Sequence, residues 1–249
     1  MTGARVARHD EGGLSTLVLT RPEKLNALDT CAFDELDAHL ADLERQTDTI
    51  GCVVLRAEGR AFCAGADLAA LGIRSDGSPI DPRYKPRVIE RLSALPMPVI
   101  AAVHGVCFTG GLELALACDF IVADATARFA DTHGKWGLVA AWGLMQRLPR
   151  RIGTPAARRM MMTGRQVDAE EAFTMGLVDL IAPEGELERT AQDLVGQILA
   201  NSWHTNFAVK RSLRETQGMN LAAALAHESY SYPGSAPDHA ERVARFTRK

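Results

Sequence analysis

The chain has 249 residues, 47% of them hydrophobic and 24% charged, and a formal net charge of −3. This length allows one large α/β domain, or a core with a smaller appendage, and it is sufficient to bury a sizeable core. A slightly acidic chain lacks the basic footprint of nucleic-acid binding proteins, so we expect no nucleic-acid partner.

The cysteines favour a reducing compartment. Their number is five, no CxxC pair occurs, and three lie in apolar runs, so we expect reduced core residues. The N-terminal stretch has no apolar segment typical of signal peptides. The longest apolar tract, residues 98–123, is interrupted by glycines and charged side chains. We therefore expect a cytoplasmic protein without a membrane span.

Strands and helices alternate along the first part of the chain. An apolar repeat at residues 33–43 predicts an amphipathic helix, and two more helices are expected at about 85–95 and 110–118. Short β-branched runs predict strands at 16–20, 52–57, 98–105, 119–124 and 127–130. Strands separated by helices indicate a mixed α/β core with parallel pairing.

Beyond residue 150 the sequence favours helices. One at 155–164 is stopped by glycine, and one at 168–176 is signalled at both ends. We divide the chain into a core of residues 1–190 and a helical region of residues 191–249. Later helices are expected near 186–200, 205–217, 220–230 and 237–247.

The stretch FTGGLELALACD, residues 108–119, predicts an apolar helix with one carboxylate, Glu113, in its first turn. Burying an unpaired carboxylate costs several kcal/mol. The first N–H groups of a helix lack partners, so Gly110 offers a free donor on the same face as Glu113. A capping glutamate is the alternative, but the capping box needs Ser or Thr where Gly110 stands.

A second turn from strand to helix contains Ala64, Gly65, Ala66 and Asp67. Alone, it is explained by an Asp N-cap after a glycine turn. Together, the two turns could direct the N–H groups of Ala66 and Gly110 at one oxygen. Such an oxyanion hole stabilises charge on a carbonyl oxygen by roughly 3 kcal/mol per donor.

At these residues the chain resembles the crotonase superfamily, the enoyl-CoA hydratases and isomerases. The matching segments follow the family order: 21–29, 61–68, 104–119, 129–137, 146–153 and the GLVD that ends at Asp179. The resemblance implies a spiral of ββα units and a C-terminal helical region that assembles a homotrimer or homohexamer. It also implies an acyl-CoA thioester substrate and no cofactor, since coenzyme A is part of the substrate.

The resemblance also implies roles for single residues. The substrate carbonyl oxygen would lie between the N–H groups of Ala66 and Gly110. Glu113 matches the first of the two catalytic glutamates of hydratases, a general acid or base. The positions that contact coenzyme A correspond to Lys24, Leu25, Ala64, Asp67 and Leu68.

The second catalytic glutamate is missing, because the family segment F-G-Q-P-E reads FADTH here and His133 occupies that column. His133 could replace the lost group, Glu113 could move a proton alone, or the chain could bind acyl-CoA with poor turnover. A structural histidine bonded to the backbone is the alternative for His133. Asp131 could orient its imidazole if residues 129–133 stay extended.

Two tryptophans in WGLVAAWG stand where small residues and a proline are common in the family. Trp142 would shape chain-length preference, although core packing explains it equally well. Residues 72–87 predict a polar loop near the acyl end. Metal-ligand spacings, a P-loop and a dinucleotide fingerprint do not occur. We expect a lyase of fatty acid metabolism that hydrates a trans-2-enoyl-CoA, with isomerisation or another enolate reaction, or acyl-CoA binding, as alternatives.

Overall fold

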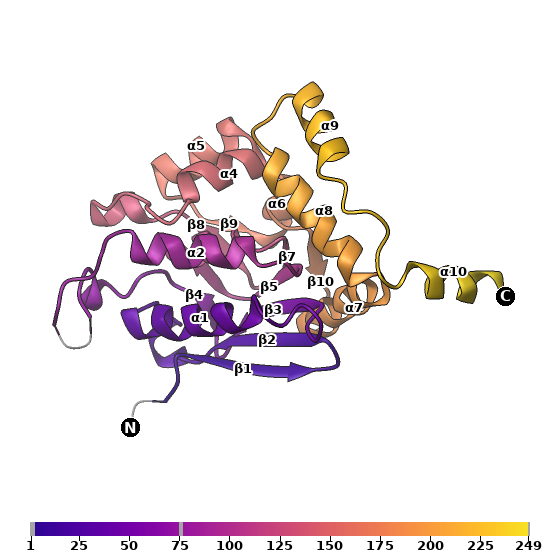
Figure 1. Cartoon of the computed structure of the whole chain (residues 1–249). Coiled ribbons are helices and arrows are strands. Elements are labelled where there is room, and N and C mark those ends of the chain that lie inside the picture. The colour runs from indigo at the N-terminus through magenta and orange to yellow at the C-terminus, as the bar shows by residue number, and fades with distance from the viewer. Residues whose placement is uncertain (1–2, 75–76, 249) are drawn as a thin grey trace.

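Six strands form the larger of two sheets, in the order β1-β2-β3-β5-β7-β10 (Figure 1). Neighbours pair parallel except β1 and β2, which form an antiparallel hairpin. The computed structural model describes residues 3–74 and 77–248, so two residues of the expected polar loop and both chain ends lie outside the described residues. The strands are β1 (Val6–Glu11), β2 (Leu14–Leu19), β3 (Cys52–Ala57), β5 (Val99–Val103), β7 (Phe120–Asp124) and β10 (Leu180–Ala182).

A smaller sheet continues the strands of the larger one. Its first three strands pair parallel, and β9 pairs antiparallel to β8. They are β4 (Ala61–Cys63), β6 (Val106–Phe108), β8 (Arg128–Ala130) and β9 (Val167–Asp168). A long strand, a short strand and a helical segment therefore recur along the chain, as in β5–β6–α3. This repeat confirms the expected mixed α/β fold, a spiral of ββα units.

Ten α-helices and three short 3-10 helices surround the sheets in the described residues. The α-helices are α1 (Thr30–Leu43), α2 (Tyr84–Ala94), α3 (Gly110–Ala115), α4 (Leu144–Ile152), α5 (Thr154–Thr163), α6 (Ala169–Thr174), α7 (Leu187–Ala200), α8 (Trp203–Thr216), α9 (Leu221–Tyr230) and α10 (His239–Thr247). The 3-10 helices are η1 (Pro22–Lys24), η2 (Leu68–Ala70) and η3 (His133–Trp136).

The larger sheet is buried on both faces because its side chains alternate between two apolar clusters. On β3, Val53 and Leu55 join the main cluster, which also contains the apolar stripe of α1. Cys52 and Val54 point to the opposite face and pack with α7. The domain boundary expected near residue 190 falls within α7, and the division into two domains stays a prediction.

Helix α8 packs on this core through Phe207 and is also held by Lys210 and Trp203. Lys210 Nζ lies 2.6 Å from Asp119 Oδ2 and donates to the carbonyl of Met97 at 2.9 Å. The ring of Trp203 lies so close to Gly51 that a β-carbon added there would be 2.4 Å from Trp203 Cε2. Ionic, hydrogen-bonding and aromatic contacts therefore hold α8 against the core.

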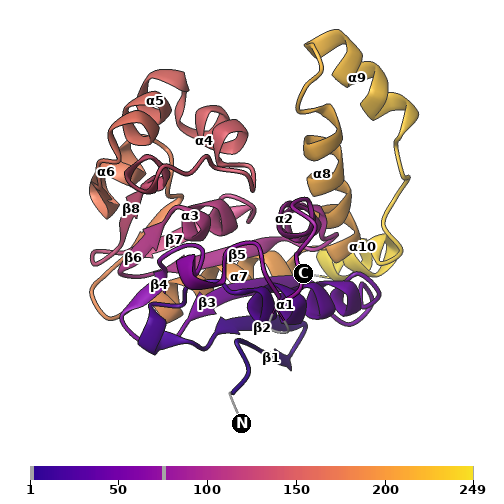
Figure 2. The same cartoon turned by 90° about the vertical axis from the view of Figure 1, so that its left-hand side faces the viewer.

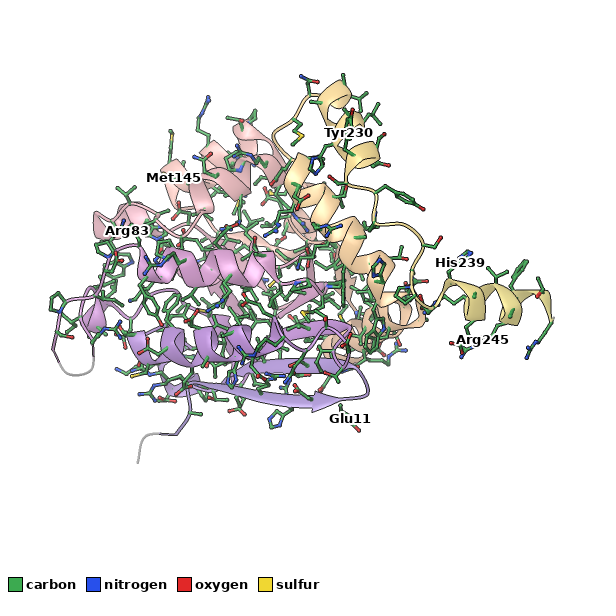
Figure 3. The ribbon with its side chains drawn as sticks, in the orientation of Figure 1. Glu11, Arg83, Met145, Tyr230, His239 and Arg245 are labelled. Atoms are coloured by element: carbon green, nitrogen blue, oxygen red, sulfur yellow. The ribbon has the colours of Figure 1, made fainter. Side chains whose placement is uncertain are left out.

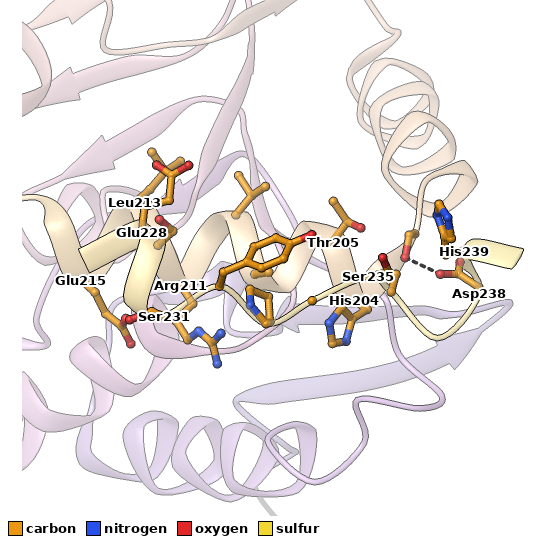
Figure 4. A pocket seen from close by; sticks show the side chains of 18 of the residues that line it. His204, Thr205, Arg211, Leu213, Glu215, Glu228, Ser231, Ser235, Asp238 and His239 are labelled. Carbon is orange, nitrogen blue, oxygen red and sulfur yellow. Dashed lines mark hydrogen bonds between the residues drawn. The ribbon is translucent and has the colours of Figure 1, made fainter. Parts of the chain in front are cut away.

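Helices α9 and α10 extend away from the sheets (Figures 1 and 2). Figure 3 shows His239 and Arg245 on α10 and Tyr230 on α9. Tyr230 is 94% exposed. A cavity of about 610 Å³ lies between these helices and α8 (Figure 4), where Ser202 Oγ donates to Asp238 Oδ1 at 2.7 Å. Exposed apolar side chains on α8–α10 include Leu213, Leu221 and Phe246.

The predicted elements mostly match the observed ones, and the differences have local causes. Helix α4 was not predicted, since Pro149 lies inside it and arginines occupy its last turn. The strand expected at 98–105 ends at Val103, because Gly105 turns the chain at a φ of +54°. All five cysteines are free, and four are buried as expected. In the described ranges, no helix has the length and apolar character needed to cross a bilayer.

Candidate active site

The two glycine turns meet in the structure. Parallel pairing of β4 with β6 places Cys63 beside Cys107, just before each turn. Thr109 Oγ1 donates to the carbonyl of Ala64 at 3.3 Å. A β-carbon on Gly65 would lie 2.0 Å from Thr109 Oγ1 and 3.2 Å from the nitrogen of Gly110. Glycine at position 65 therefore permits the close approach of the two turns.

The N–H groups of Ala66 and Gly110 have no acceptor among the described residues. Leu28 bridges to both neighbours of Ala66, since it donates to Gly65 O at 2.8 Å and accepts from Asp67 N at 3.0 Å. Gly110 is the first residue of α3, where an N–H has no intrahelical partner. Two free donors on adjoining turns are the arrangement that an oxyanion hole requires, and this role of the pair stays a prediction.

Thr109 holds the second turn in an unusual conformation. Its φ is +47° and its ψ is −112°, a combination that β-branched residues rarely adopt. Such strain persists only where surrounding contacts fix it, and it is frequent at functional sites. Here the hydroxyl bond to Ala64 and the N–H bond from Thr109 to Ala130 O at 2.9 Å fix the residue.

Glu113 is 1% exposed, and its carboxylate is bonded to residues outside its own helix. Its Oε1 accepts the N–H groups of Trp142 at 2.7 Å and Leu144 at 3.2 Å. Burial raises the pKa of Glu113, and these two hydrogen bonds offset only part of the rise. The carboxylate is thus bonded to a distant segment and does not cap α3, so its Oε2 remains available for another partner.

That second oxygen faces His133. The distance from Glu113 Oε2 to His133 Nε2 is 3.9 Å, and His133 Nδ1 lies 2.7 Å from Asp131 Oδ1. Burial lowers the pKa of His133, but the bond to Asp131 and the two carboxylate charges outweigh this, so the pKa is raised. The ring is bonded to a carboxylate, which disfavours a histidine held by the backbone.

Asp131 orients the imidazole by a route that differs from the expected one. Residues 129–133 do not stay extended, because β8 ends at Ala130 and η3 begins at His133. Instead, Asp131 Oδ1 also accepts the backbone N–H of His133 at 3.0 Å, a turn typical of aspartate. The side chain of Asp131 is buried and fixes both the backbone and the ring of His133.

Trp142 packs in the core and borders the candidate site. Its ring meets that of Phe33 edge-on, with centroids 4.9 Å apart. A β-carbon on Gly110 would lie 2.3 Å from Trp142 Cζ3, so the indole covers the first residue of α3. The contact of Trp142 with a substrate stays a prediction.

The positions expected to contact coenzyme A lie in two neighbouring segments, at the end of η1 and at the start of η2. Ala64 N donates to Leu25 O at 2.9 Å, which joins the loop after η1 to the first glycine turn. Lys24 and Leu68 are exposed. Asp67 Oδ2 accepts from Arg21 Nη1 at 2.7 Å, so this side chain has a structural partner. Coenzyme A contacts at these five residues stay predictions.

The sequence reasoning missed Lys85 near this site. This residue is only 7% exposed, and its Nζ lies 5.9 Å from the ring centroid of Trp142. In the sequence it stands at the end of a polar loop, where a lysine is normally solvated. Only the packing of α2 against α1 reveals its burial.

The chain is similar to known enzymes over nearly its whole length. The family model described as enoyl-CoA hydratase/isomerase matches residues 9–246. A 1,2-epoxyphenylacetyl-CoA isomerase of Escherichia coli is 32% identical, with 98% of this chain and 95% of the relative covered. A short-chain-enoyl-CoA hydratase of Clostridium acetobutylicum is 29% identical, with 96% and 93% covered. The crystal structure of an enoyl-CoA hydratase from Bacillus anthracis superposes with a TM-score of 0.90 at 28% identity, covering 98% of this chain and 96% of that one.

Proposed function

The chain belongs to the enoyl-CoA hydratase/isomerase family, and we propose that within this family it is a hydratase, which adds water to a trans-2-enoyl-CoA. One observation carries the proposal: Glu113 Oε2 and His133 Nε2 lie 3.9 Å apart. This distance is too long for a direct hydrogen bond but suits one water molecule bonded to both groups. His133 thereby supplies the second polar group that the missing glutamate would have provided.

The reaction that we propose begins with the thioester carbonyl between the N–H groups of Ala66 and Gly110. The oxygen of the held water adds to Cβ, and one of its protons passes to Glu113 Oε2. The electron pair of the double bond moves toward the thioester, where the two N–H groups stabilise the enolate oxygen. His133 Nε2–H then protonates Cα.

This order of steps requires that Glu113 and His133 together carry one proton at the start. The pKa of Glu113 is raised by burial, and that of His133 is raised by Asp131 and Glu113 against the effect of burial. Asp131 favours the imidazolium as the proton carrier, because the carboxylate pairs with the charged ring. After the reaction, transfer of the proton from Glu113 to His133 restores the starting state.

Double-bond isomerisation is the second candidate. The same two groups could move one proton between two carbons of the acyl chain without any water, and one relative is named an isomerase. The mass of the product separates the two reactions, since hydration adds one water and isomerisation leaves the mass unchanged.

The test uses crotonyl-CoA and a longer trans-2-enoyl-CoA with the purified chain. We expect loss of the conjugated-thioester absorbance and a product heavier by one water, with deuterium at Cα when the reaction runs in D₂O. Binding without any change in absorbance or mass would contradict the hydratase assignment and favour an acyl-CoA-binding role.

We also propose a homotrimer, or a homohexamer built from two trimers, located in the cytoplasm. The exposed apolar side chains of α8–α10 support the assembly, because soluble monomers rarely expose so many on adjacent helices. Light scattering of the purified chain tests the proposed assembly.

A further inference from the structure

Lys85, near the start of α2, is buried but has no hydrogen-bond acceptor for its ammonium group among residues 3–74 and 77–248. Its Nζ instead lies 5.4 Å from the ring centroid of Phe33 and 5.9 Å from that of Trp142. Two aromatic faces compensate part of a positive charge. The ammonium keeps some accessible surface, because no fully enclosed side-chain nitrogen or oxygen among the described residues lacks a hydrogen-bond partner. It still loses most of its water at this position, and a bound anion would recover part of that cost.

Among the described charged residues around Lys85, this lysine is the cation that has no ion-pair partner. Burial lowers its pKa, and three aspartates that act on it electrostatically oppose this effect only in part. Each of these aspartates already has a cationic partner. The pairs are Asp29 with Arg5 and Arg21, each at 3.2 Å, Asp34 with Arg74 at 3.7 Å, and Asp67 with Arg21 at 2.7 Å.

The surroundings of Lys85 are also those of the candidate active site. The indole of Trp142, over which the ammonium lies, packs on Gly110, and the N–H of Trp142 bonds to Glu113. Asp67, which acts on the ammonium, directly follows Ala66. An acyl chain that starts at the two glycine turns and runs along the indole would therefore bring its far end toward Lys85.

We propose that Lys85 binds a carboxylate at the distal end of the acyl chain, so that the substrate is an ω-carboxy-2-enoyl-CoA. This inference rests on the proposed function, since it extends the same acyl site. A carboxylate fits better than a keto or hydroxyl oxygen, because only an anion balances the positive charge of Lys85 while accepting its hydrogen bonds. Phe33 and Trp142 supply apolar surface for the methylene groups before it.

The experiment compares trans-2-hexenedioyl-CoA with trans-2-hexenoyl-CoA, which have equal length and differ in the terminal carboxylate. We expect the wild type to favour the diacid thioester in kcat/KM by about tenfold to a hundredfold, and Lys85→Met to lose this preference. Arg87→Met is the matched control, because Arg87 lies on the same helix with a side chain 61% exposed. It should keep the preference.

Binding of the saturated analogues, hexanedioyl-CoA and hexanoyl-CoA, is measured by calorimetry and needs no turnover. Equal affinity for both in the wild type, unchanged in Lys85→Met, would overturn the role of Lys85 even if hexenoyl-CoA is hydrated. A diacid preference that depends on Lys85, without hydration of any substrate, would support the role of Lys85 and refute the hydratase. Lys85→Gln repeats the test if Lys85→Met melts at a lower temperature than the wild type.

Discussion

Replacing Asp131 by Asn tests whether His133 works as a proton carrier. The substitution removes the charge that faces His133 Nδ1 at 2.7 Å, while the amide oxygen can still accept the backbone N–H of His133. The local turn should therefore persist. A hydrogen bond to a charged group contributes about 1.5–3 kcal/mol, and a neutral one about 1 kcal/mol. The imidazolium should lose roughly 0.5–2 kcal/mol of stabilisation, which lowers kcat/KM by about twofold to thirtyfold.

The pH dependence gives the sharper readout. In the wild type the pKa of His133 is raised, so the imidazolium, and with it the activity, persists to higher pH and is lost as the pH rises through that pKa. Asp131→Asn lowers the pKa, so activity should fall at lower pH than in the wild type. We would measure kcat/KM for crotonyl-CoA between about pH 5 and pH 10, the range in which imidazoles with shifted pKa values titrate.

A double-mutant cycle supplies the control. In a His133→Ala background, Asp131→Asn should have no further effect on kcat/KM, since its target is gone. An unchanged rate and an unchanged alkaline limb in Asp131→Asn, with the melting temperature preserved, would refute the reasoning and return His133 to a structural role.

Two further substitutions test burial and packing. Glu113→Gln should lower kcat by about 10²- to 10⁴-fold. It should also raise the melting temperature at pH 8, because the raised folded-state pKa of Glu113 makes its ionisation destabilising as the pH rises. This gain should vanish at low pH, where Glu113 is protonated. A melting temperature that falls equally at every pH would contradict this account. Gly51→Ala should destabilise the chain by about 1–3 kcal/mol in urea unfolding, because the new β-carbon would lie 2.4 Å from Trp203 Cε2. Gly51 lacks a positive φ, so a neutral or stabilising result would mean that Trp203 moves freely.

The regular elements were predictable where the periodicity was strong. The apolar stripe of α1 and the β-branched run of β3 were found within a few residues of their observed bounds. The short strands β4 and β6 were not predicted, because three residues carry too little periodicity. Their pairing is what joins the two turns, so the meeting of the turns could not be derived from the sequence.

The candidate site was predictable in its residue types but less so in its bonds. Glu113 stood out because a carboxylate is unusual in an apolar helix. The sequence could not reveal that Trp142 and Leu144 donate to it from a segment about thirty residues away. Lys85 gave no signal, since its burial depends on side chains from α1 and from the segment after η3. Long-range packing, which periodicity does not encode, decided both cases.

Positions 65 and 109 cannot change independently. Any side chain at position 65 would overlap Thr109 Oγ1, and removing that hydroxyl would release its bond to the carbonyl of Ala64. A mutational path that enlarges Gly65 first passes through a chain with both turns displaced. A path that begins with Thr109→Gly relieves the strain at a positive φ and removes the overlap with the hydroxyl, but it loosens the turn. Position 65, at a φ of +108°, still disfavours any side chain. The pair is therefore epistatic, because a change at either position alters the contacts that constrain the other.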